Sequence, residues 1–140
     1  MRGLNKLYWL KIDIENINKE IANIETEIRS LPTISSPQLD GMPHGTGISN
    51  PTVNYVIKKE ALEEKLKELG RMLEDTRSKR IAEEQRLRGI IERIDEPDVK
   101  TMAEMRFILN MKWEDIGRAT SYDRSVCYRK VKKYIENMDL

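Results

Sequence analysis

The sequence has very little of the residue types on which most catalytic and metal sites depend. It contains one cysteine, Cys127, and one histidine, His44, in 140 residues. A single cysteine allows no disulfide within the chain and favours a reducing compartment. A lone histidine without nearby cysteines makes a poor metal site. No Ser-His-Asp arrangement is present either, and we therefore expect no enzymatic activity, no cofactor and no metal.

Long apolar runs are also lacking. No stretch approaches the roughly 18 consecutive apolar residues that a membrane span needs. The first residues, MRGLNKLYWLKIDIENINKE, become charged too early for a signal peptide. We therefore expect no membrane partner and a cytoplasmic location.

Aromatic residues are scarce and charged residues are abundant, at 6% and 35% of the chain. This balance favours long exposed helices with narrow apolar seams over a large globular core. Lys and Arg number 25 against 24 Asp and Glu, so the formal net charge is only +1. Any strongly basic segment is therefore a local feature.

An unbroken heptad pattern predicts a first helix over residues 4–31. Its apolar residues recur at alternating spacings of three and four, which is typical of a coiled-coil-like helix. Pro32 ends the pattern. The seam residues are Leu7, Leu10, Ile14, Ile17, Ile21, Ile24, Ile28 and Leu31.

Residues 32–50 contain three prolines and three glycines, which predicts a loop. GMPHGTG within it lacks the Lys-Ser/Thr pair of a P-loop, so nucleotide binding is not expected. The loop is either a mobile link or a segment that docks in the protein's own assembly. Asn50 and Pro51 are placed to start the next helix, as its cap and its first residue.

A second, longer helix is predicted from about Pro51 to Ile94. Its seam resumes after a polar gap at Thr76, Arg80 and Glu83. A hairpin of two unequal helices buries little surface per residue, so a partner helix is expected, most simply from a second copy of the chain. The apolar seam residues are Leu62, Leu66, Leu69, Leu73, Leu87, Ile90 and Ile94.

Short helices are expected after DEPD, residues 95–98, with Asp98 as a cap. They run over about 98–109, 113–120 and 123–138. The predicted fold is all-α, with no sheet: residues 1–96 form a helical hairpin for oligomerisation, and residues 97–140 form a three-helix DNA-binding domain.

The last two of these helices have the form of a helix-turn-helix. Asp123 is placed to cap the second helix, whose apolar face is formed by Cys127, Val131, Tyr134 or Ile135, and Met138. Residues 117–135 hold six cations and one anion. A helix about 10–12 Å across fits the major groove of DNA.

A basic face predicts DNA contact, although such a face can also be merely solvated. We expect Arg124, Ser125, Tyr128 and Arg129 to face the bases, and Lys132 and Lys133 to hold phosphates. Arg118 of the preceding helix completes the predicted DNA-binding set. Tyr128 either packs against its neighbours or touches a thymine methyl group or a phosphate. Trp113 is expected in the core, and Cys127 as a small buried side chain.

Residues 105–135 resemble region 4 of the bacterial primary sigma factors. They are more similar still to the ArpU/RinA-type late-gene transcriptional regulators of phages. The similarity is carried by Met105-Arg106-Phe107, Trp113-Glu114-Asp115-Ile116, Tyr122 and Cys127-Tyr128-Arg129, and by the loop GMPHGTGISNPT at residues 41–52. The resemblance implies a phage-type transcriptional regulator that binds double-stranded DNA in the cytoplasm of a bacterial host and contacts host RNA polymerase.

The sequence departs from this family's pattern around the first helix of the motif. Lys112 stands where a capping Ser or Thr is usual, Gly117 where Ala is usual, and Ser121 where the turn usually has Gly. Glycine costs about 1 kcal/mol in a helix relative to alanine. These residues predict a weakened first helix and turn.

Two other functions remain open at this point. A small terminase-like DNA-packaging subunit also joins a helix-turn-helix to coiled-coil helices, and would form a ring of many copies. A purely structural coiled-coil protein would carry the motif without using it. A dimer favours the regulator and a closed ring favours the packaging subunit, whereas DNA binding separates both from the structural protein.

Overall fold

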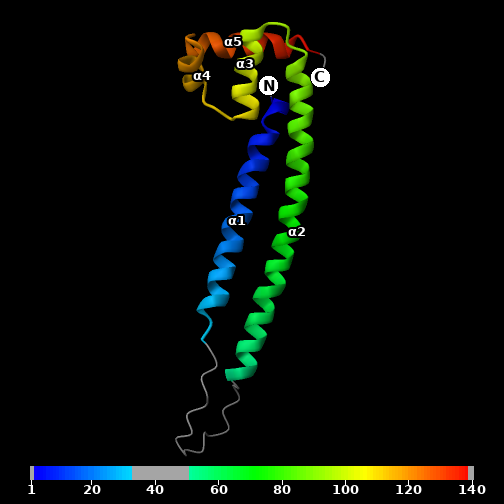
Figure 1. The fold of residues 1–140 in the computed structure, drawn as a ribbon, viewed down its shortest axis with the longest axis vertical. Coiled ribbons are helices and arrows are strands. Elements are labelled where there is room, and N and C mark those ends of the chain that lie inside the picture. Colours follow the sequence, from blue (N-terminus) through cyan, green and yellow to red (C-terminus); the bar gives the residue numbers. More distant parts are fainter. Residues whose placement is uncertain (1, 33–50, 139–140) are drawn as a thin grey trace, which may run out of the picture. The chain divides into compact units, whose positions relative to one another are not determined.

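The computed structural model describes residues 2–32 and 51–138, and every regular element in these ranges is a helix (Figure 1). The all-α class is therefore confirmed. The elements are a 3-10 turn η1 (Arg2–Leu4), α1 (Lys6–Ser30), α2 (Pro51–Glu92), α3 (Pro97–Ala103), a π-helical turn η2 (Glu104–Ile108), α4 (Trp113–Thr120) and α5 (Arg124–Glu136).

The predicted helix ends lie within two residues of the observed ones, but the residue predicted to cap α3, Asp98, is wrong. Glu96 is its N-cap residue and Pro97 takes the first turn, because proline has a suitable φ and lacks an N–H that would need a partner. Asp98 is therefore already inside the helix, where its Oδ1 accepts a hydrogen bond from the Val99 N–H at 2.9 Å. The predictions for the loop, including Asn50 and His44, fall outside the described residues.

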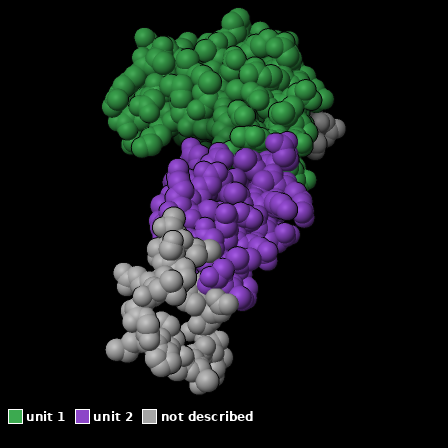
Figure 2. Space-filling view, turned by 60° about the horizontal axis from the view of Figure 1, so that its bottom comes forward, with its two compact units in different colours: residues 1–14, 75–140 green, residues 15–74 purple. Residues whose placement is uncertain are grey.

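The chain divides into two compact units, which Figure 2 colours separately: residues 1–14 with 75–140, and residues 15–74. The second unit contains most of the predicted seam. Its Ile17 and Ile24 are buried on α1, as are Leu69 and Leu73 on α2. The remaining seam residues of this unit are half-buried, namely Ile21, Ile28, Leu31, Leu62 and Leu66.

The core of the first unit joins residues far apart in the sequence. Leu4 and Leu7, at 2% and 0% exposed, belong to one apolar cluster with Leu87 and Ile94 of the α2 end and with the buried residues of α3, η2, α4 and α5. This packing crosses residue 96. The two compact units divide the chain after residues 14 and 74, and not at residue 96. The predicted boundary between an oligomerisation part and a DNA-binding part therefore stays a prediction about function.

The polar gap in the α2 seam lies inside this first unit. Glu83 is only 6% exposed and is held by the Arg86 guanidinium at 2.7 Å, which also donates to the Gly3 carbonyl. Lys11 of α1 donates to the Ile108 carbonyl and to Asn110 Oδ1. The N-terminal end of α1 is thus fixed by polar contacts as well as by its leucines. Desolvation, together with the nearby Arg80, lowers the pKa of the Lys11 ammonium.

Candidate nucleic-acid interface

A tight turn joins α4 to α5. Ser121 ends α4 in the left-handed region, at φ 62°. Asp123 is the N-cap residue of α5, and its side chain accepts a hydrogen bond from the Ser125 N–H at 3.2 Å, so this capping prediction is confirmed. A Cβ atom on Gly117 would lie 2.7 Å from the Tyr122 carbonyl oxygen. Glycine therefore lets α4 pass close to the turn, which accounts for its presence in place of alanine.

The apolar face predicted for α5 is the buried one. Cys127 and Val131 are fully buried and Ile135 is 5% exposed. Tyr134 and Met138 are half-buried and pack against the same core. Because this face is taken up by the core, four of the five basic residues of α5 are exposed: Arg124, Arg129, Lys132 and Lys133.

An ion pair ties α5 to the start of α3. Lys130 Nζ lies 3.0 Å from Asp98 Oδ2, and the Tyr122 hydroxyl donates to the same oxygen at 3.4 Å. The Lys130 ammonium also lies 4.6 Å from the centre of the Tyr122 ring. The hydrogen bond from Lys130 lowers the pKa of Asp98, and Asp98 in turn raises the pKa of Lys130. Lys130 thus positions α5, which fits its absence from the predicted DNA-binding set.

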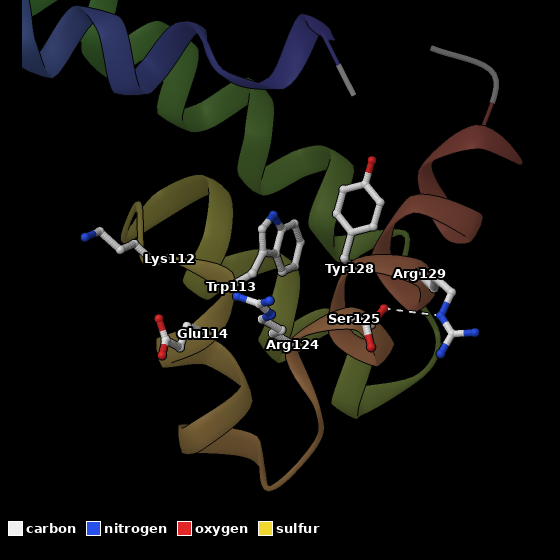
Figure 3. Close-up of a pocket in the computed structure, with 7 residues that line it drawn as sticks. All are labelled: Lys112, Trp113, Glu114, Arg124, Ser125, Tyr128 and Arg129. Carbon is white, nitrogen blue, oxygen red and sulfur yellow. Dashed lines mark hydrogen bonds between the residues drawn. The ribbon is translucent and has the colours of Figure 1, made fainter.

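Four predicted site residues come together around an open hollow of about 470 Å³ (Figure 3). Three residues from the start of α4, which were not predicted as part of a site, complete its lining. The seven lining residues are Lys112, Trp113, Glu114, Arg124, Ser125, Tyr128 and Arg129. The start of α4 could have been singled out only by knowing that it lies beside the exposed face of α5.

Trp113 and Tyr128 form an edge-to-face pair in this hollow, with ring centroids 5.5 Å apart and an angle of 89° between the planes. Trp113 packs against the core, as expected, but it is only half-buried and also lines the hollow. Tyr128 packs against its neighbour Trp113, the first of the two alternatives considered for it, and is still 38% exposed; its contact with DNA stays a prediction.

The π-helical turn η2 also contacts Trp113, through the side chain of Arg106. The Leu109 N–H donates to the Glu104 carbonyl, five residues back, and Asn110 follows at φ 57°. Arg106 of this turn donates to the Met111 carbonyl, and its guanidinium lies 5.0 Å from the Trp113 ring centre. The chain that enters α4 is therefore held by side-chain contacts, although Lys112 supplies no capping hydrogen bond.

The other three predicted site residues lie outside the hollow. Arg118 is paired with Glu114 at 3.1 Å and with Asp115 at 3.6 Å. Lys132 lies 5.7 Å from the Tyr128 ring centre and 3.8 Å from a Glu136 oxygen.

Three of the predicted cations, Arg124, Arg129 and Lys133, carry charge that the described residues do not neutralise. Within residues 2–32 and 51–138, no hydrogen bond or ion pair engages the side chains of Arg124 and Lys133. Arg129 donates from Nε to the Ser125 carbonyl at 3.3 Å, a contact that fixes the side chain but leaves its charge uncompensated. The exposed side of α5 thus presents positive charge to any partner.

In the described part of the chain, no three His, Cys, Asp or Glu side chains gather as a metal ion would require. Among the helices described, none is both long enough and apolar enough to cross a membrane. Comparison with known proteins gave no match to any family model, curated protein or solved structure.

Proposed function

We propose that the protein is a transcriptional regulator that binds double-stranded DNA, with α5 lying in the major groove. The observation that carries this proposal is the exposed side of α5, where Arg124, Arg129 and Lys133 have no anionic partner among the described residues. Its rigid support adds to the argument, because the Asp123 cap and the Asp98–Lys130 ion pair hold the helix in place.

The two ends of α5 have different roles in this proposal. Residues of its first turns, around Arg124 and Arg129, meet base edges, because the N-terminal part of a recognition helix enters the groove most deeply. Lys132 and Lys133 lie further along the helix and meet phosphates. Arg118 adds less than the sequence predicted, since two neighbouring carboxylates already offset its charge.

Self-association through the long helices is the second part of the proposal. In residues 15–74, several seam residues remain half-buried in the single chain, among them Ile21 and Ile28. Val53 and Ile57 near the start of α2 are 49% and 58% exposed. A second copy would cover such surface, and a dimer would carry two DNA-reading helices, so that half-site spacing adds specificity. A contact with host RNA polymerase rests on the sequence resemblance alone.

Selection from a random library of DNA duplexes tests the main proposal. The full-length protein should enrich a common sequence. Its affinity should fall steeply as the salt concentration rises, because the release of counterions from the DNA then becomes less favourable. Sedimentation at the same protein concentrations should give a dimer. A closed ring of many copies would indicate the packaging subunit, and equal binding to selected and scrambled duplexes would refute sequence reading.

A further inference from the structure

The hollow beside α5 places an apolar surface among positive charges. The aromatic pair, Trp113 and Tyr128, supplies the apolar surface. The hollow's charged lining residues are three cations and one anion, Glu114, which is already paired with Arg118. Such a surface suits an anionic partner that carries a small apolar group at its edge.

DNA presents one such group in the major groove, the C5-methyl group of thymine, with phosphates nearby. We propose that the aromatic pair reads thymine through this methyl group, an inference that rests on the proposed DNA binding. Trp113 sits at the start of α4 and Tyr128 on the exposed side of α5. Base recognition at this position would therefore come from both helices rather than from α5 alone.

Arg124 supplies the neighbouring contact. Arg124 lines the same hollow as Trp113, whereas Arg129 donates from Nε to the Ser125 carbonyl and in Figure 3 its side chain extends away from the aromatic pair. No described residue engages the Arg124 side chain, so both of its terminal amino groups are available for the two acceptors of guanine. The preferred site is therefore expected to contain a thymine next to a guanine.

Tyr128 is the residue through which the idea is best tested. Trp113 also packs against the core and the Arg106 guanidinium, so its replacement would disturb the fold. Tyr128 is 38% exposed, and the removal of its ring leaves the buried side of α5 unchanged. Tyr128→Phe keeps the ring and removes only the hydroxyl group, which makes it the matched control.

The experiment replaces each thymine of the selected duplex, one at a time, by deoxyuridine, which lacks only the methyl group. With the wild-type protein, one position per half-site should lose about three- to fivefold in affinity, the effect of burying one methyl group. The same replacement should have no effect on Tyr128→Ala, and its full effect on Tyr128→Phe. Lys133→Ala should lose the same factor of affinity for the thymine duplex and for the deoxyuridine duplex. The ratio between the two affinities, which measures the methyl effect, should therefore stay as in the wild type.

The outcomes separate this inference from the function beneath it. If the protein binds its selected duplex but tolerates deoxyuridine everywhere, the thymine contact is refuted and DNA binding stands. The same conclusion follows if Tyr128→Ala keeps the full deoxyuridine effect. If no duplex binds and an acidic peptide with an apolar anchor binds in the hollow instead, both proposals fail. Circular dichroism of Tyr128→Ala confirms that any loss of binding comes from a folded protein.

Discussion

Two positions of α4 and its turn, Gly117 and Ser121, have backbone geometries that favour glycine. Gly117 lies within the helix, where alanine would ordinarily be about 1 kcal/mol better, yet a Cβ atom there would meet the Tyr122 carbonyl oxygen at 2.7 Å. Ser121 adopts φ 62°, a conformation that glycine adopts without the steric cost of a side chain. Both positions therefore favour glycine, but only residue 117 is one.

Replacing Gly117 by alanine and Ser121 by glycine should therefore shift the free energy of unfolding in opposite directions. Gly117→Ala should lower the free energy of unfolding by roughly 1–3 kcal/mol, because the contact is with backbone that must move. Ser121→Gly should raise it by about 1 kcal/mol. Urea titration followed by circular dichroism measures both. A Gly117→Ala variant as stable as the wild type would mean that the turn adjusts without cost.

The Asp98–Lys130 ion pair predicts a pH dependence of stability. The pKa of Asp98 is lowered by Lys130, so its contribution is present at neutral pH and is lost as the pH falls through the folded-state pKa, below the ordinary 3.8. The raised pKa of Lys130 acts at the other end, where stability is lost as the pH rises above the ordinary 10.5. Asp98→Asn should thus be less stable than wild type near neutral pH and equally stable in strong acid. Unfolding titrations at both pH values test this, and a difference that persists in acid would point to a lost hydrogen bond instead.

At the scale of elements, periodicity predicted what depends on local sequence. The seam spacing gave both long helices, and the Trp113–Thr120 helix was predicted with its observed bounds. The π-helical turn at Glu104–Ile108 was missed, because its geometry goes together with contacts such as Lys11 to the Ile108 carbonyl, 97 residues away in sequence. Only the α5 side of the hollow was predicted, because its other side also depends on contacts between residues far apart in the sequence. The α5 residues follow from one helical face, but the approach of Trp113 requires the folded structure.

The two ends of α5 should respond differently to mutation. Lys133→Ala should weaken binding to all duplexes alike and reduce the salt dependence by about one unit, because it removes one phosphate contact. Arg124→Ala should cost about 1–3 kcal/mol on the selected duplex, and much less on scrambled DNA, if it makes a two-bonded contact with a base. Titrations at several salt concentrations distinguish the two. Equal losses on both duplexes for every variant would mean that α5 holds DNA without reading it.

At the scale of the whole molecule, the test of self-association has to spare the packing of the single chain. Ile17 and Ile24, the obvious seam residues, are buried within residues 15–74, so a charge there would unfold that unit as well as any dimer. Val53 and Ile57 on α2 are 49% and 58% exposed, and their substitution leaves the internal seam intact.

The double variant Val53→Glu, Ile57→Glu should sediment as a monomer at concentrations where the wild type is a dimer, with unchanged helical content. It should also bind a single half-site as well as the wild type does and lose affinity for the paired site. Glu60→Gln, a change on the same helix that adds no charge to an apolar position, is the control. A double variant that remains dimeric would place the interface elsewhere, and a wild type that is monomeric at micromolar concentration would remove the second DNA-reading helix from the proposal.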